Sequence, residues 1–176
     1  YLQLLQKYQK KKYWYSKMAI IFRYVHIPRP DGTLRNAPYI PLIVRDETGK
    51  SIQVVALLDS GADNTVIPKD LAETLGLKES EFESETGGIG GKVKVKKTRF
   101  SFILKGSREN YPLSVPALVL QDRNADIPLL LGRHGFFEHF HITFKQDEEK
   151  VILKKINPKK FYWDFLKVSK LRVNYN

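Results

Sequence analysis

A carboxylate follows directly on an apolar stretch of the chain. Residues 54–58 are all apolar, and Asp59, Ser60 and Gly61 come immediately after them. A carboxylate at the end of a buried strand costs free energy unless hydrogen bonds or a function offset that cost. Gly61 allows the turn unusual dihedral angles, and its N–H can approach the carboxylate closely. Two interpretations of Asp59 follow: a structural Asx turn, or a group that performs acid–base chemistry.

The elements that must position Asp59 are predicted to be mostly strands. Apolar or alternating runs separated by turn residues predict seven of them. Pro68 near a first turn and Gly76 just past an end predict a short helix within 66–75, and 135–140 predict a second. The pattern is typical of an all-β barrel or sandwich with two short helices. The predicted strands are 19–26, 38–44, 51–58, 92–104, 113–120, 140–145 and 150–156.

Three motifs resemble those of retropepsin-like aspartic proteases, in the cellular and prokaryotic branch of that family. Residues 57–66 (LLDSGADNTV) resemble the family's active-site segment, and the likeness continues to Leu77. Residues 129–133 (LLLGR) resemble its second motif, and 87–91 (GGIGG) fall where the family has its flap. Order and spacing agree over about 18–153. The combination is far more specific than a lone Asp-Ser-Gly.

The resemblance implies a closed-barrel acid protease fold with one lobe per subunit, and an endopeptidase without a cofactor. Aspartic proteases use two carboxylates that share one proton, because like charges about 3 Å apart cannot both ionise. One carboxylate activates a water molecule while the other polarises the scissile carbonyl. Asp31 lies in a Pro-rich turn, and neither Asp122 nor Asp126 precedes Ser-Gly or Thr-Gly. The second carboxylate must therefore be Asp59 of a second copy, in a two-fold homodimer, and a monomer should be inert.

The resemblance also suggests a role for each matching residue. The Ser60 hydroxyl is expected to cross the dimer axis, and Asp63 and Arg133 to form a partly buried ion pair that is costly to break from one side. The flap is expected to close over an extended substrate. In the plainer interpretation, 87–91 is an ordinary hairpin loop and Arg133 a surface charge. The predicted set comprises catalytic Asp59, supporting Ser60, Gly61, Asp63 and Arg133, and substrate-binding Ala62, Asn64, Val66, Gly88, Ile89 and Gly90.

The net charge of +11 is concentrated at the two ends of the chain. Residues 1–17 carry five Lys and no acid, whereas 18–153 are neutral in sum. We interpret 1–17 as a basic extension upstream of a natural start at Met18, 18–156 as the protease domain, and 157–176 as a basic aromatic extension. The ends predict weak contact with nucleic acid or another anionic surface. Solvated tails are the alternative.

Several function classes are excluded by composition. The absence of Cys excludes a disulfide scaffold, a thiolate zinc site and a cysteine nucleophile. His134, His139 and His141 are interpreted as surface or capping residues, so we expect no metal site. No apolar run approaches the roughly 20 residues that span a bilayer, and the expected location is the cytoplasm.

The rival to a protease is a binding module. A retropepsin-like dimer could hold a peptide or an anionic partner without cutting it. The complete Asp59-Ser-Gly-Ala-Asp63 segment favours the enzyme, whereas the basic ends favour the rival.

Overall fold

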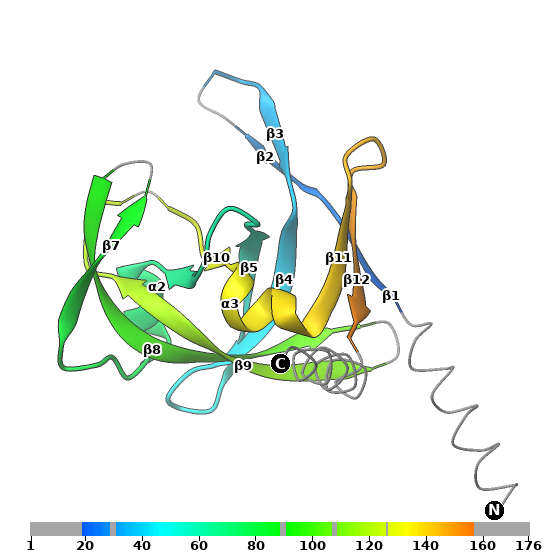
Figure 1. Ribbon diagram of the computed structural model, residues 1–176. Helices are drawn as coiled ribbons and strands as arrows, with labels where there is room; N and C mark the ends of the chain where they lie inside the picture. The colour runs from blue at the N-terminus through cyan, green and yellow to red at the C-terminus, as the bar shows by residue number, and fades with distance from the viewer. Residues whose placement is uncertain (1–18, 29–30, 89–90, 107–108, 126, 157–176) are drawn as a thin grey trace, which may run out of the picture.

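Strands make up most of the described chain. The computed structural model describes residues 19–28, 31–88, 91–106, 109–125 and 127–156 (Figure 1), so the predicted extensions at 1–17 and 157–176 lie outside the described residues, as does Met18. The elements are β1 (Ala19–Arg23), β2 (Val25–Pro28), β3 (Leu34–Ala37), β4 (Tyr39–Arg45), β5 (Ser51–Leu58), β6 (Thr65–Ile67), α2 (Lys69–Thr74), β7 (Glu83–Gly88), β8 (Gly91–Lys105), β9 (Asn110–Leu120), β10 (Leu130–Leu131), α3 (Arg133–Phe136), the 3-10 helix η1 (Phe137–His139), β11 (Phe140–Lys145) and β12 (Lys150–Lys155).

Six of these strands close into a barrel. The sheet order is β4-β5-β10-β6-β9-β8-β7, and a further pairing of β4 with β8 at Ile43 and Ile103 joins its two sides. Closure removes the free edges that an open sheet would leave for pairing with other chains. The interior is filled by side chains with almost no exposure, among them Leu42, Phe100 and Phe136. The mostly β barrel with two short helices confirms the predicted fold class.

The middle of the barrel contains two short strands that the sequence pattern did not predict. β10 is two residues long and pairs in parallel with β5 and in antiparallel fashion with β6. Val66 was predicted at the start of a helix, but it pairs with Leu130 and Leu118 and belongs to β6. The helix begins only after Pro68, which is its N-cap residue and whose ring holds φ at −57°. Gly76 follows its end with φ +62°, as its place in the sequence predicts.

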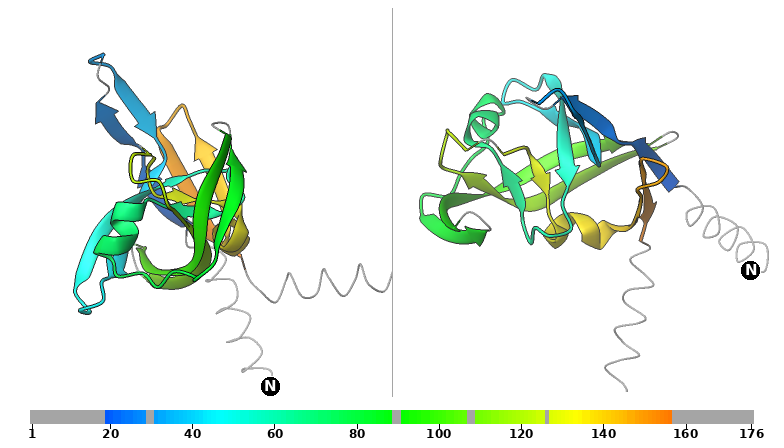
Figure 2. Two further views of the ribbon diagram at one scale, coloured as in Figure 1. Left: turned by 90° about the vertical axis from the view of Figure 1, so that its left-hand side faces the viewer. Right: turned by 90° about the horizontal axis from the view of Figure 1, so that it is seen from above.

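Outside the barrel lie a terminal sheet and a separate hairpin (Figures 1 and 2). The terminal sheet has the order β1-β12-β11, and the hairpin consists of β2 and β3. The single strand predicted at 19–26 is two strands in the structure, because the chain changes partner at Tyr24. β1 pairs with β12 as far as Arg23, the Tyr24 N–H makes one more hydrogen bond in the same register, to the Glu149 carbonyl oxygen at 2.8 Å, and from Val25 the chain pairs with β3. Among the described residues, no helix has the length and apolar character needed to cross a bilayer.

A partly buried ion pair ties α2 to the segment that follows it. The Lys69 Nζ lies 2.7 Å from a Glu79 carboxylate oxygen, and the Gln121 side chain donates to the other oxygen at 3.0 Å. Burial by itself raises the pKa of Glu79, but the hydrogen bonds from Lys69 and Gln121 outweigh it and hold that pKa below its ordinary value. A carboxyl whose pKa is lowered by folding stabilises the fold above its unfolded pKa and loses that effect as the pH falls through the folded value.

Replacing this carboxylate should weaken the fold in a pH-dependent way. Glu79→Gln is expected to lower the free energy of unfolding by about 1–3 kcal/mol at neutral pH, because a hydrogen-bonded charge is lost. The difference from wild type should shrink as the pH falls below about 4.5 and then through the lower pKa of the folded state, where the wild-type carboxyl takes up its proton. Urea unfolding at neutral pH and at acid pH measures the two free energies, and Glu81→Gln, at an exposed residue, is the control. An equal loss at both pH values would contradict the assignment.

Candidate active site

Asp59 sits at the end of β5 in a turn closed by its own side chain. One Asp59 carboxylate oxygen accepts a hydrogen bond from the Gly61 N–H at 2.9 Å, and the Ala62 N–H lies 3.3 Å from the Asp59 carbonyl oxygen. A Cβ on residue 61 would lie 3.2 Å from that same carboxylate oxygen, so any side chain there would crowd the acid. Asp59 is half-buried, while Ser60 and Gly61 are exposed. The Asx turn is thus present, and it holds a carboxylate at the surface of the lobe.

The second predicted motif lies directly against this turn. The Leu57 N–H donates to the Leu129 carbonyl oxygen at 2.8 Å, and the Asp59 N–H to that of Leu131 at 3.1 Å. At the next contact the donor lies on the other segment: the Arg133 N–H donates to the Ala62 carbonyl oxygen at 2.9 Å. Segments 57–63 and 129–134 are therefore held together by backbone hydrogen bonds along their length. We call residues 59–64 the Asp59 turn.

Gly132 is required where the two segments cross. A Cβ at this position would lie 2.3 Å from the Asn64 carbonyl oxygen and 2.4 Å from its carbonyl carbon. No side chain fits at such distances from backbone atoms. Packing therefore requires the glycine of the Leu-Leu-Gly-Arg motif at this position.

Asp63 and Arg133 form the expected ion pair, but in a different environment. A guanidinium nitrogen of Arg133 donates to a carboxylate oxygen of Asp63. The Asp63 side chain is 76% exposed and that of Arg133 is 57% exposed, so the pair is not partly buried as the sequence suggested. Solvent therefore screens this pair in the single lobe.

The flap predicted at 87–91 is partly described. β7 and β8 form a hairpin in which Gly88 pairs with Gly91, whereas Ile89 and Gly90 lie outside the described residues. One face of the hairpin carries cross-strand ion pairs, Lys92 with Glu85 at 3.3 Å and Lys94 with Glu83 at 3.0 Å. The end of β7, the start of β8 and the end of β5 lie toward the same side of the molecule, the upper side in Figure 1.

The remaining predicted substrate-binding residues lie along the Asp59 turn and the strand after it. Ala62 and Asn64 are half-buried in the turn, and Val66 is half-buried in β6. The predicted site residues of the turn and Arg133 are thus brought together, while the flap tip is not described.

A hollow beside the ion pair contains residues that the sequence reasoning missed. Its volume is about 430 Å³, and Asp63, Arg133, His134, Phe137 and Glu138 line it. The His134 Nδ1 lies 3.2 Å from a Glu138 carboxylate oxygen. The four-residue spacing of His134 and Glu138, directly after the second motif, was the signal that could have indicated them.

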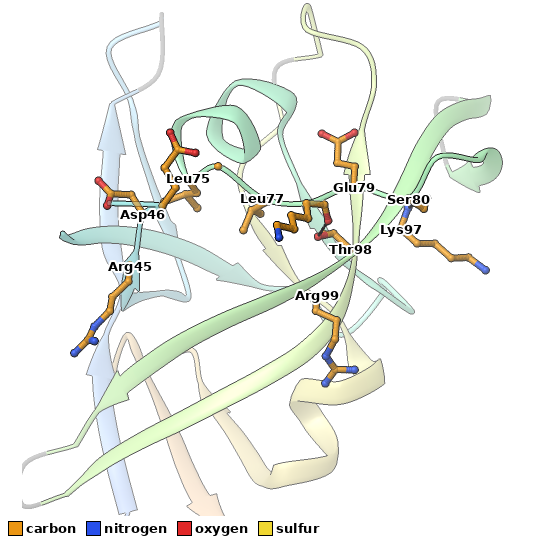
Figure 3. A pocket seen from close by; sticks show the side chains of 12 residues that line it. Arg45, Asp46, Leu75, Leu77, Glu79, Ser80, Lys97, Thr98 and Arg99 are labelled. Carbon is orange, nitrogen blue, oxygen red and sulfur yellow. Dashed lines mark hydrogen bonds between the residues drawn. The ribbon is translucent and has the colours of Figure 1, made fainter. Parts of the chain in front are cut away.

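A larger hollow of about 680 Å³ lies elsewhere, and none of the predicted site residues lines it (Figure 3). It is bounded by the β4–β5 turn, the segment after α2, and β8. Leu75 and Leu77 supply apolar lining, while Arg45, Lys97 and Arg99 point in different directions (Figure 3). These three cations therefore do not converge on one point. Over the described part of the chain, no three His, Asp or Glu side chains gather in a way that could hold a metal ion.

The contact at Gly132 predicts a large effect of one methyl group. Gly132→Ala should lower the free energy of unfolding by at least about 3 kcal/mol, because the backbone at Asn64 must move. Gly87→Ala is the matched control, since a Cβ there meets nothing within 4 Å. Chemical denaturation of both variants measures the difference. Similar stabilities for the two would show that the segments do not pack as described.

The exposed Asp63–Arg133 pair predicts a small effect. Arg133→Gln should change the free energy of unfolding by less than about 1 kcal/mol, because solvent screens the pair. A double-mutant cycle with Asp63→Asn isolates the interaction. A coupling energy of several kcal/mol would instead indicate that Asp63 and Arg133 form a buried ion pair.

Comparisons with known proteins agree with this geometry. Residues 44–134 match the family described as aspartyl protease. No curated protein matches the chain. Among solved structures, the chain is similar to a retropepsin-like aspartic protease from Rickettsia conorii, with TM-score 0.51 and 19% identity over 77% of this chain and 98% of that one.

Two further structures are similar at lower TM-scores. One is EIAV protease in complex with the inhibitor HBY-793, with TM-score 0.39 and 25% identity over 55% of this chain and 82% of that one. The other is the retroviral protease-like domain of Ddi1 from Leishmania major, with TM-score 0.45 and 17% identity over 69% of this chain and 94% of that one. The family match spans just over half of the 176 residues, and the barrel is shared with the Rickettsia structure. The chain belongs to the aspartyl protease family and has its retropepsin-like fold.

Proposed function

We propose that the protein is an aspartic endopeptidase that works as a homodimer. The observation that carries this proposal is the Asp59 turn, in which a half-buried carboxylate is held by the Gly61 N–H at the surface of one lobe. The chain contains one Asp-Ser-Gly motif, at 59–61. A pair of carboxylates that shares a proton therefore requires a second copy of the turn.

In the proposed dimer each subunit supplies one Asp59. The unprotonated carboxylate takes a proton from a water molecule as it attacks the scissile carbonyl carbon, and the protonated one hydrogen-bonds the carbonyl oxygen. The Gly61 N–H keeps each carboxylate in place throughout. Ser60 is exposed beside Asp59, so its hydroxyl is free of the lobe's own packing and available to the opposite subunit.

Substrate is proposed to bind as an extended strand between the flap and the Asp59 turn. Backbone groups of Ala62 and Asn64 and the glycines of 87–91 would bond its main chain, as in strand addition. Val66 offers an apolar wall, so apolar side chains are expected next to the cut bond. Closure of the flap would exclude water other than the attacking molecule. The cytoplasmic location expected from the sequence remains part of this proposal.

The test of the chemistry is a single change at the acid. Asp59→Asn should lower peptide cleavage by at least about 10²–10⁴-fold, because the shared proton and the base are both lost. Wild type and variant are compared on a diverse peptide mixture between about pH 3 and pH 8, with cut sites read by mass spectrometry. Asp122→Asn is the control, because Asp122 also accepts a turn hydrogen bond, from the Asn124 N–H at 2.9 Å, but lies outside the site.

Each outcome of this comparison has a distinct meaning. If wild type and Asp122→Asn cut peptides and Asp59→Asn does not, the proposal is supported. Equal cleavage by Asp59→Asn would reject Asp59 as the acid. A folded dimer that cuts nothing in any form would favour the binding module instead.

The proposal also predicts how activity depends on concentration. Sedimentation should give a particle of twice the 20.4 kDa chain mass, and specific activity should fall on dilution as dimers dissociate. A strict monomer that cuts at every concentration would contradict the shared site.

A further inference from the structure

The end of the β7–β8 hairpin has no third strand beside it. β8 pairs with β9 only from Val95 onward, and β7, at the end of the sheet order, pairs with β8 alone. Before Val95, the Gln121 N–H still donates to the Lys94 carbonyl oxygen at 2.9 Å. Figure 1 shows this end of the hairpin extending past the end of β9. We call residues 85–88 and 91–94 the ribbon.

Side chains give the ribbon little packing. Gly87, Gly88 and Gly91 contribute no side chain to it, and glycine weakens a strand. On one face Thr86, which is half-buried, lies opposite Val93, which is 36% exposed. None of the described side chains of the ribbon is fully buried. Because a two-stranded hairpin is marginally stable in water, the pairing of the ribbon depends on contacts other than apolar burial.

Charged side chains of alternating sign run along the other face of the hairpin. Glu83 and Glu85 of β7 lie on this face, since side chains alternate along a strand. Lys92 and Lys94 of β8 lie on it too, opposite Gly87 and Glu85. The Lys94 Nζ lies 3.0 Å from a Glu83 carboxylate oxygen. The Lys92 Nζ lies 3.3 Å from a Glu85 carboxylate oxygen. We call these four charged side chains the charge ladder.

The charge ladder is continuous along the hairpin. The hydrogen bond and charge of Glu83, and then the charge of Glu85, hold the pKa of Lys94 above its ordinary value. Lys94 is therefore attracted to both carboxylates and links the two ion pairs. The side chain of Lys92 is 81% exposed and that of Lys94 is 69% exposed, so each pair is weak and is screened by salt. Several such charges in one row can still decide the order of a segment that has few other contacts.

The charge ladder ends beside the glycines of the predicted flap. Lys92 lies directly opposite Gly87 and is next to Gly91 in the chain. The pair of Lys92 with Glu85 is therefore the ion pair nearest to the backbone pairing of Gly88 with Gly91. A contact that holds the two strands together at Lys92 also keeps these glycines in register.

We propose that the charge ladder positions the flap: it keeps the ribbon paired and so places the main chain of Gly87 and Gly88 for binding substrate. For its effect on substrate this inference rests on the proposed function. The positioning weakens as ionic strength rises, because the Debye length falls from about 10 Å at 0.1 M salt to about 3 Å at 1 M. Since the charge ladder contains no group that performs the chemistry, its loss raises KM and leaves kcat unchanged.

The first experiment measures the pairing of the ribbon by amide hydrogen exchange and does not require cleavage. In the ladder variant all four charges of the ladder are replaced by Gln, so the net charge is unchanged. At about 0.02 M salt the ribbon of this variant should exchange at least about threefold faster than that of wild type, and the difference should disappear near 1 M salt. Lys92→Arg, which keeps the charge, should exchange like wild type.

A matched control removes an exposed ion pair from another hairpin. Lys145→Gln with Glu148→Gln breaks a pair at the β11–β12 turn and also leaves the net charge unchanged. The ribbon of this control should exchange at the wild-type rate. Equal exchange of the ribbon in wild type and the ladder variant at low salt would overturn the proposal.

The second experiment separates substrate binding from chemistry. At about pH 6, where exposed carboxylates are charged, the ladder variant should show a KM at least about threefold above that of wild type at low salt, with kcat within about twofold. The KM of wild type should approach that of the variant as salt is added, and the control should follow wild type. An equal KM for wild type and ladder variant at low salt, or a fall in kcat alone, contradicts the positioning role.

The two proposals fail in different ways. Wild type that cuts no peptide rejects the proposed function and with it the role in substrate binding, while hydrogen exchange still decides whether the charge ladder holds the ribbon. Cleavage that depends on Asp59, with a KM that the ladder charges do not change, rejects the positioning role and keeps the protease.

Discussion

The backbone contact between segments 57–63 and 129–134 is the constraint on which the rest of the site depends. Hydrogen bonds join Leu57 to Leu129 and Asp59 to Leu131, and beyond them the Arg133 N–H turns back to the Ala62 carbonyl oxygen. The two backbones come so close at Asn64 that only glycine fits at 132. Because these bonds are made by main-chain atoms in the middle of a closed barrel, the Asp59 carboxylate is presented on a rigid support.

A single lobe with this design has half of the groups that acid protease chemistry requires. Its carboxylate is held by the Gly61 N–H, yet the hydroxyl of Ser60 and the ion pair of Asp63 with Arg133 stand open to solvent. In the proposed dimer, the second copy would cover these side chains. The proposed dimer follows from this openness at the Asp59 turn.

Some elements of the fold leave a local signal in the sequence, and others do not. β5 was predicted with its observed bounds, and the end of α2 at Gly76 was recognised, because apolar runs and backbone-specific residues leave strong local signals. β10 and β6 were missed because strands of two and three residues are defined by their partners and have no periodicity of their own. The strand at 19–26 was predicted as one, since the change of partner at Tyr24, from β12 to β3, depends on tertiary pairing and leaves no local signal. The residues of the Asp59 turn and Arg133 were predicted from motifs, but the exposure of their ion pair depends on tertiary packing that the motifs do not encode.

The shared carboxylate pair is tested most directly by mixing subunits. Wild type is held at a fixed concentration at which it cuts peptide, and increasing amounts of Asp59→Asn protein are added until it is in large excess. Mixed dimers then replace wild-type dimers, and each mixed dimer contains one Asp59 carboxylate. Our account predicts that cleavage falls toward zero as the excess grows. Cleavage that stays constant per wild-type chain, whatever the excess of Asp59→Asn, would show that one chain suffices and would contradict the shared site.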